Sequence, residues 1–362
     1  PELNKSTIDQ TISRINTAKN DLHGVEKLQR DKGTANQEIG QLGYLNDPQK
    51  SGEESLVNGS NTRSEVEEHL NEAKSLNNAM KQLRDKVAEK TNVKQSSDYI
   101  NDSTEHQRGY DQALQEAENI INEIGNPTLN KSEIEQKLQQ LTDAQNALQG
   151  SHLLEEAKNN AITGINKLTA LNDAQRQKAI ENVQAQQTIP AVNQQLTLDR
   201  EINTAMQALR DKVGQQNNVH QQSNYFNEDE QPKHNYDNSV QAGQTIIDKL
   251  QDPIMNKNEI EQAINQINTT QTALSGENKL HTDQESTNRQ IEGLSSLNTA
   301  QINAEKDLVN QAKTRTDVAQ KLAAAKEINS AMSNLRDGIQ NKEDIKRSSA
   351  YINADPTKVT AF

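Results

Sequence analysis

Apolar residues recur along the chain at helical spacing, on narrow stripes that leave most of each turn polar. One stripe consists of Ile134, Leu138, Leu141 and Leu148, and it returns as Ile8, Ile12, Ile15, Leu22 and as Ile260, Ile264, Ile267, Leu274. Residues separated by about three, four or seven positions share one face of a helix. The pattern therefore predicts an all-α fold.

A fixed period organises these stripes. The segment INTAMQALRDKV (202–213) recurs as LNNAMKQLRDKV from Leu76 and as INSAMSNLRDGI from Ile328, so that Met80, Met206 and Met332 lie at equal steps of 126 residues. Such a period is typical of a repeat array. Because the chain starts and stops inside this period, we expect a segment of a larger protein with a partial module at each end.

Each period resolves into two groups of three helices. In the first group, the repeated segment is followed by a helix from near Thr104 that Asn126 and Pro127 stop, and then by a third helix. The third helix starts with a capping signature, which is Ser132 with Glu135, Ser6 with Asp9, or Asn258 with Glu261. The second group follows Gly150 and has a short middle helix containing Val183 and a third helix with Pro190 in its first turn.

The groups are expected to close alternating three-helix bundles. Bundles of the second type are predicted at 25–73, 151–199 and 277–325, and bundles of the first type at 74–150 and 200–276. Residues 1–24 are predicted to be a third helix alone, and residues 326–362 a first helix and loop.

One helix is expected to serve two bundles at each junction, because no glycine or further proline interrupts the chain from Pro190 to Val213. At about 100° per residue, the buried face turns by roughly a quarter of the circumference along this helix. The junction positions in the three copies are Val66, Leu70, Leu76, Met80, Leu83; Val192, Leu196, Ile202, Met206, Leu209; and Val318, Leu322, Ile328, Met332, Leu335. The prediction is an elongated string of bundles, semi-rigid because a flexible linker is absent.

Composition narrows the partners without changing this fold. Only 31% of the residues are apolar and 2% are aromatic, which excludes one large core and favours small bundles. The net charge of −13 is interleaved with Lys and Arg, and no basic stripe carries aromatic residues, so nucleic acid is not an expected partner. Cysteine is absent, and no apolar run approaches the roughly 18 residues of a membrane span.

No residue cluster indicates catalysis. The seven histidines share no repeat phase and no metal-ligand spacing, so we expect them to be solvent-exposed, and we expect no metal, cofactor or enzyme activity. The Arg-Asp pairs that start at Arg84, Arg210 and Arg336 are either ligand contacts or, as we favour, anchors for the loop that follows each pair. Tyr99, Tyr225 and Tyr351 are either loop anchors for a ligand or plugs over the end of a bundle, and the scarcity of aromatics favours the plug.

The repeated segments resemble two known modules. LNNAMKQLRDKV, DYIND and YDQALQEAENII, all within 76–121, are similar to the FIVAR module, as is YINADPTKVTAF at 351–362. LLEEAKNNAITGINKLTALNDAQRQKAIENV (153–183) is similar to the GA module, a three-helix unit of bacterial albumin-binding proteins. In the first GA-like copy, Pro48 and Gly52 stand where the second has Ala174 and Lys178. This departure weakens the case for a middle helix there and for albumin-type binding through that face.

Their alternation resembles the repeat region of the staphylococcal extracellular matrix-binding protein family. The resemblance implies a giant cell-wall-associated surface protein that binds fibronectin-type matrix or supports the envelope. The leading hypothesis is a monomeric, non-catalytic, multivalent spacer whose bundles each contact a matrix protein such as fibronectin weakly. The rival hypotheses are serum-albumin docking by the bundles at 151–199 and 277–325, and a passive stalk whose ligands bind elsewhere in the parent protein.

Overall fold

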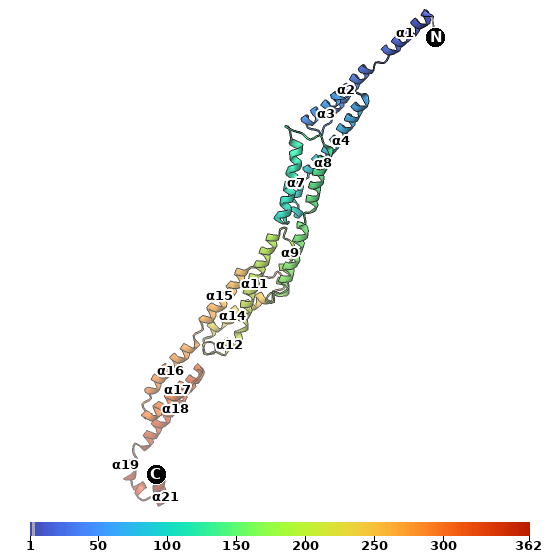
Figure 1. Cartoon of the computed structure of the whole chain (residues 1–362). Coiled ribbons are helices and arrows are strands. Elements are labelled where there is room, and N and C mark those ends of the chain that lie inside the picture. The colour runs from blue at the N-terminus through green and yellow to red at the C-terminus, as the bar shows by residue number, and fades with distance from the viewer. Residues whose placement is uncertain (2–3) are drawn as a thin grey trace. The chain divides into compact units, whose positions relative to one another are not determined.

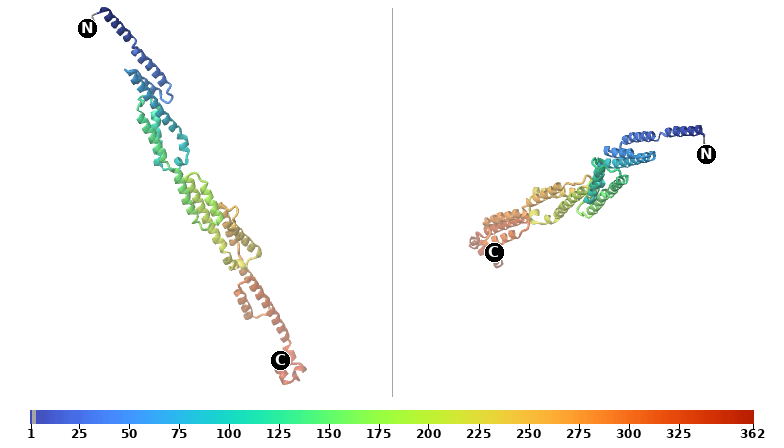
Figure 2. Two further views of the ribbon diagram at one scale, coloured as in Figure 1. Left: turned by 90° about the vertical axis from the view of Figure 1, so that its right-hand side faces the viewer. Right: turned by 45° about the horizontal axis from the view of Figure 1, so that its top comes forward.

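The computed structural model describes residue 1 and residues 4–362, and within these residues it contains helices and no strand. Residues 2–3, which belong to the predicted partial module 1–24, lie outside the described residues. The chain divides into two compact units, one formed by Pro1–Ala161 with Gln184–Asn193 and the other by Ile162–Val183 with Gln194–Phe362. Figures 1 and 2 allow the helices to be followed in chain order.

The first unit contains α1 to α8, together with the first parts of α9 (Gly150–Ile165) and α11 (Ile189–Gly214). After α1 (Lys5–Asn20), α2 (Gly24–Gly40), α3 (Asp47–Gly59) and the first half of α4 (Arg63–Ala88) form what we call the first GA-like bundle. The first FIVAR-like bundle is formed by the second half of α4 with α5 (Lys90–Gln95), α6 (Ser97–Ile100), α7 (Thr104–Asn122) and α8 (Lys131–Asn146). Figure 1 shows α4, α7 and α8 side by side.

Two small hydrophobic cores follow one another along α4. The GA-like core consists of Ala35, Ile39, Val57, Val66 and Ala73. The FIVAR-like core consists of Leu45, Leu76, Ala79, Met80, Leu83, Val93, Tyr110, Leu114, Ala117, Ile134, Leu141 and Leu148. The change from one core to the next falls between Ala73 and Leu76, within continuous helix.

The middle helix of the first GA-like bundle is present, so the expectation that Pro48 and Gly52 weaken it was wrong. Pro48 lies in the first turn of α3, where backbone N–H groups have no acceptor within the helix, so the N–H that proline lacks is not missed there. Asn46 and Gln49 form a capping box that fixes the start of the helix. At Gly52, a Cβ atom would lie 2.8 Å from Cδ1 of Leu129, so the glycine makes room for that leucine.

The third FIVAR-like helix begins differently from the prediction. The capping residue is Asn130, whose side chain accepts a hydrogen bond from the backbone N–H of Ser132, and α8 starts at Lys131. Asn4 and Asn256 cap the equivalent helices in the same way. The predicted caps at Ser6, Ser132 and Asn258 were wrong, because asparagine two residues earlier takes this role.

The second unit contains the rest of α9, most of α10 (Asp173–Gln184), most of α11, and the later helices. The second FIVAR-like bundle comprises part of α11 with α12 (Gln216–His220), α13 (Ser223–Phe226), α14 (Glu230–Asp248) and α15 (Lys257–Thr272). The GA-like bundle after it comprises α16 (Gly276–Glu292), α17 (Thr299–Gln311) and the first half of α18 (Arg315–Ile339). The short helices α19 (Lys342–Lys346), α20 (Ser349–Ile352) and α21 (Pro356–Ala361) follow.

The helices at either end leave their apolar stripes exposed. In α1, no residue is buried, and Ile8, Ile12 and Ile15 are between 45% and 61% exposed. In the last segment, Leu335, Ile339 and Phe362 are likewise more than half exposed. These stripes match those that pack inside the complete bundles.

We predict that backbone amides in α1 and in residues 328–362 exchange with solvent faster than those of α8, because few apolar contacts oppose local opening there. Hydrogen exchange of the chain, resolved by peptide, measures the difference. Equal protection in α1 and α8 would mean that the exposed stripe has found a partner in solution.

Candidate functional site: the module junctions

The long helices α4, α11 and α18 carry the predicted junction residues. In α4, Val66 and Leu70 pack in the GA-like core, and Leu76, Met80 and Leu83 pack in the FIVAR-like core. In α11, Val192 is fully buried and Leu196 lies against Gly164, while Ile202, Met206 and Leu209 belong to the second FIVAR-like core. In α18, Val318 and Leu322 pack in the GA-like core, Met332 is half-buried, and Ile328 and Leu335 are exposed.

A repeated pair of side chains fixes the GA-like loop against this helix. In the first copy, Oδ1 of Asn77 accepts the N–H of Tyr44 at 3.0 Å, and Nε of Arg84 donates to the carbonyl of Tyr44 at 2.8 Å. Asn203 and Arg210 make the equivalent bonds to Ala170, and Asn329 makes the equivalent bond to Ser296. Arg336 instead donates to the neighbouring carbonyl of Ser295. Asparagine and arginine lie about two helical turns apart and therefore share one face.

These contacts correct the expectation for the Arg-Asp pairs. The arginines bind a loop about 40 residues earlier in the chain, not the loop that follows them. The aspartates stay on their own helix, since Asp85 accepts from Lys81 and Asp211 accepts from Gln207. The arginine is thus a contact between bundles.

Two further amides reach from the GA-like loop into the next bundle. In the second unit, Nδ2 of Asn172 donates to the carbonyls of Ile247 and Lys249 at 2.9 and 3.1 Å, and Nε2 of Gln175 donates to the carbonyl of Ile254 at 2.8 Å. The oxygens of the same two amides accept from each other's backbone N–H groups and so start α10. Asn46 and Gln49 repeat the arrangement on Ile121, Glu123 and Thr128.

The same loop also inserts apolar side chains. Leu45 and Leu171, next to these amides, are buried in the cores of the first and second FIVAR-like bundles. The junction from a GA-like to a FIVAR-like bundle therefore consists of the shared helix, a buried leucine and several hydrogen bonds.

The opposite junction, from FIVAR-like to GA-like, uses one asparagine. Nδ2 of Asn101 donates to the carbonyl of Gln187 at 3.0 Å, and its Oδ1 accepts the N–H of Ile189 at 2.9 Å. In the second unit Asn227 makes the same two bonds to Lys313 and Arg315. A Cβ atom at the neighbouring Gly150 or Gly276 would collide with the carbonyl oxygen of Ser97 or Ser223, so the close approach requires glycine.

The charges at this junction differ between the copies. In the first, Asp102 accepts from the N–H of Gln149 and from His106. In the second, the buried Glu228 accepts from Ser275 and Lys279, and Asp229 accepts from Lys279 and Arg315. Burial alone would raise the pKa of Glu228, but the hydrogen bonds from Lys279 and Ser275 outweigh it and lower the pKa to about 2. Glu228 is therefore ionised at neutral pH.

The three repeated tyrosines lie against the aromatic residue that shares the next repeat phase. Tyr99 is half-buried, and its ring meets that of Tyr110 edge-on with 5.9 Å between the ring centroids, while its hydroxyl donates to Asp111 at 2.9 Å. The ring centroids of Tyr225 and Tyr236 are 6.1 Å apart, and the hydroxyl of Tyr225 donates to Asp237. The ring centroids of Tyr351 and Phe362 are 5.5 Å apart.

Not every histidine is exposed as expected. His220 is partly buried because its ring stacks on Tyr225, with 4.1 Å between ring centroids, and its Nε2 lies 2.7 Å from Asp237. His69 and His106 are also partly buried. Within residue 1 and residues 4–362, no three His, Cys, Asp or Glu side chains gather in a way that could hold a metal ion.

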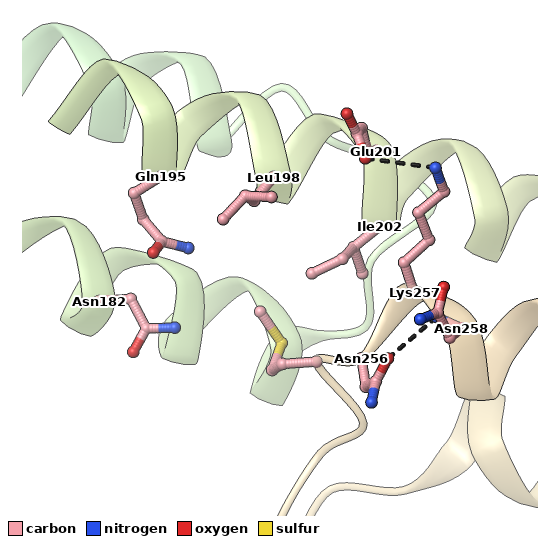
Figure 3. A pocket seen from close by; sticks show the side chains of 9 residues that line it. Asn182, Gln195, Leu198, Glu201, Ile202, Asn256, Lys257 and Asn258 are labelled. Carbon is pink, nitrogen blue, oxygen red and sulfur yellow. Dashed lines mark hydrogen bonds and ion pairs between the residues drawn. The ribbon is translucent and has the colours of Figure 1, made fainter. Parts of the chain in front are cut away.

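A groove of about 650 Å³ lies beside the junction in the second unit (Figure 3). Its walls are Asn182, Gln195, Leu198, Glu201, Ile202 and residues 255–258. Lys257 at the start of α15 lies 3.3 Å from Glu201 of α11, so the charges in the groove are already paired.

Among the helices that the structure describes, none has the length and apolar character needed to cross a membrane.

Family models match the alternation along the chain. The FIVAR domain model matches residues 1–23, 79–149, 205–275 and 331–362, which together make up more than half of the chain. The GA module model matches residues 25–79, 151–205 and 277–331. The two modules predicted from the sequence are therefore confirmed.

Curated relatives and a solved structure agree with these matches. The chain is 35% identical over 361 residues to the extracellular matrix-binding protein ebh of Staphylococcus aureus strain NCTC 8325, and covers 4% of that protein. It is 35% identical over 360 residues to the extracellular matrix-binding protein EbhA of strain Newman, and covers 10% of it. The crystal structure of the 756–1003 domain of S. aureus EbhA aligns with a TM-score of 0.62 and 26% identity, over 68% of this chain and 98% of that one. The all-α fold of repeated three-helix bundles is thereby confirmed.

We predict that the substitution Asn172→Asp destabilises the second FIVAR-like bundle by about 1–3 kcal/mol. The carboxylate still caps α10 but cannot donate to the carbonyls of Ile247 and Lys249. Urea unfolding and hydrogen exchange at the end of α14 measure the effect.

Asn298→Asp is the matched control. Asn298 caps α17 in the same capping box, but within the described residues its amide makes no such contact with a following bundle. If both substitutions changed stability equally, the cap would explain the effect and the contact between bundles would contribute nothing measurable.

Proposed function

Because this chain belongs to the family of proteins built from alternating FIVAR domains and GA modules, we propose that it is an orienting, multivalent spacer in a bacterial cell-surface adhesin. The observation that carries the proposal is the construction of the junctions. At each junction described above, side chains in repeated positions form hydrogen bonds with the neighbouring module. A chain of independently tumbling domains would not require these bonds.

The adhesive part of the proposal is supported by the names of the relatives. Both S. aureus proteins are described as extracellular matrix-binding, and neither name indicates an enzyme. We infer that the FIVAR and GA modules contact a host matrix protein such as fibronectin, each contact being weak. The chain spans 4% of the length of the first relative. Several FIVAR and GA modules lie within this chain itself, so their weak contacts add through avidity.

Albumin binding is the second candidate, and the GA module matches favour it. The geometry of the junctions argues against albumin binding through the middle helix of a GA module. The first two turns of α3 are in contact with the next module through Gln49 and Gly52, and Gln175 makes a contact equivalent to that of Gln49 from α10. A ligand on that part of the helix would compete with the neighbouring FIVAR module.

For the spacer, we expect the apparent affinity for immobilised fibronectin to rise steeply with repeat number. Linked weak contacts raise avidity by about 100-fold or more when they can bind together. Surface plasmon resonance on chains of one and two 126-residue repeats, beside the complete 362-residue chain, measures this trend. Equal affinity for one repeat and for the complete chain would contradict multivalent binding, and no binding by any of them would favour a passive stalk.

For albumin, we expect no binding by the complete chain at albumin concentrations up to about 100 μM, the range of very weak association. Isothermal titration of the chain with serum albumin is the measurement, and residues 151–199 alone serve as the comparison. Binding by the complete chain would favour albumin binding over the matrix-binding spacer as the function. Binding by 151–199 alone would indicate that the neighbouring modules cover the site.

A further inference from the structure

Each GA module buries one carboxyl side chain, although its core is otherwise apolar. These residues are Glu53 on α3, Asp199 on α11 and Glu305 on α17, with exposed fractions of 2%, 0% and 8%. The positions are not uniform among the copies. Ala179 stands at the position of Glu53, and Ala73 and Ala325 stand at the position of Asp199. An alanine therefore fits each of these positions, and the GA fold does not require a carboxyl side chain there.

Glu53 lacks a full set of partners. Within the described residues its Oε2 atom has no hydrogen-bond partner. The charged groups that act on it are His69 and Glu72 of α4, which pair with each other at 3.0 Å. Burial raises the pKa of Glu53 to about 7, with Glu72 adding to the shift and His69 opposing it.

The charges of α2, which packs against α3, have other partners. Nζ of Lys32 donates to the carbonyl of Asn58 at 2.8 Å. Glu38 pairs with Lys74 of α4. On α3 itself, Lys50 donates to the carbonyl of Gly40. None of these three contacts involves the Glu53 carboxyl, which explains why burial dominates its titration.

Asp199 is more completely enclosed. Its Oδ1 atom accepts from Nε2 of Gln195 at 3.1 Å, and within the described residues its Oδ2 atom has no partner. Burial raises the pKa of Asp199, and the hydrogen bond from Gln195 opposes the shift.

We propose that the first two GA modules are pH-responsive elements, packed most tightly in acid and more readily opened as the pH rises, through neutrality in the first module. The carboxyls of Glu53 and Asp199 carry this response, because each must hold a charge without full compensation inside a small core. Opening a GA module releases the helix that it shares with the next FIVAR module. The pH thus sets how firmly successive modules are oriented.

The sign of the response follows from linkage. A group whose pKa is raised by folding contributes stability that is fully present below its unfolded pKa and is lost as the pH rises through the folded pKa. For Glu53 this range runs from 4.5 to about 7. Glu228 at the FIVAR-to-GA junction responds in the opposite direction, since its lowered pKa gives stability that is lost only when the pH falls below 4.5 towards 2. Between pH 5.5 and 7.5 that carboxylate stays ionised.

The test is hydrogen exchange of the complete chain at pH 5.5 and 7.5, corrected for the intrinsic pH dependence of amide exchange. We expect the opening equilibrium of α2 and α3 to increase by roughly tenfold between these two pH values. In the variant Glu53→Gln the increase should disappear, because the amide has nearly the same shape and does not titrate. Unchanged opening in the wild-type chain, or an increase that persists in Glu53→Gln, would overturn the proposal.

Two further variants separate Glu53 from its surroundings. Glu68→Gln removes an exposed carboxylate of α4 in the same module and should leave the pH response intact. His69→Gln introduces the residue that the second copy has at this position, Gln195, and removes the imidazole that pairs with Glu72 beside Glu53. If the response vanished in His69→Gln but remained in Glu53→Gln, the histidine would be its origin and the proposal would be wrong.

Asp199→Ala provides an independent test, since both other copies carry alanine there. We expect α10 to open less readily at pH 7.5 in this variant, and the difference from the wild type to shrink as the pH is lowered. More frequent opening in Asp199→Ala at both pH values would show that Asp199 supports the fold and would contradict its assigned role.

Discussion

The continuous helix that leaves a GA module and enters a FIVAR module is the constraint on which the other features depend. In α4 the backbone hydrogen bonds continue unbroken from Arg63 to Ala88, while the apolar contacts change core between Ala73 and Leu76. A helix cannot rotate one half against the other without losing those bonds. The orientation of the two cores therefore follows from which face of one helix each core occupies.

Polar side chains then fix the loops against this helix. Asn46 and Asn172 each cap a helix with the oxygen of the amide and reach the next module with its nitrogen. A half-buried amide that lost one of these roles would leave a polar atom unpaired, at a cost of about 1–3 kcal/mol. Directional bonds of this kind specify one arrangement of neighbours, which apolar contacts alone specify less sharply.

The two module types use buried charge in opposite ways. At the FIVAR-to-GA junction, Glu228 is enclosed together with Lys279 and several N–H donors, so its charge is stabilised. In the GA cores, Glu53 and Asp199 are enclosed with too few donors, so their charge is penalised. A bundle with few large apolar residues has little stability in reserve, and a single such carboxyl is a large fraction of it. In our proposal, the GA modules are therefore the parts of the array whose stability responds to pH.

The sequence by itself determined the all-α fold, the 126-residue period and the identity of the two modules. These properties depend on the types of side chain and their spacing, and the agreement among the copies allowed them to be predicted without a structure. It also placed Pro190 in the first turn of α11. By contrast, it assigned the third-helix caps to the wrong residues, because several polar residues in a row compete for one cap. It also weakened the case for α3, because proline and glycine generally oppose a helix, whereas Pro48 lies in the first turn and Gly52 makes room for Leu129.

Only the tertiary structure decided what the repeated polar side chains bind. Arg84 donates to the carbonyl of Tyr44, and Asn172 donates to the carbonyl of Ile247, which lies 75 residues away. The acceptors are backbone carbonyls, and every residue has one, so no side chain in the sequence marks the partner. Which carbonyl is free depends on where a helix ends and which loop lies beside it. The burial of Glu53 and Asp199 was hidden for the same reason, because a polar residue on a helical stripe reveals its environment only when the neighbouring helices are in place.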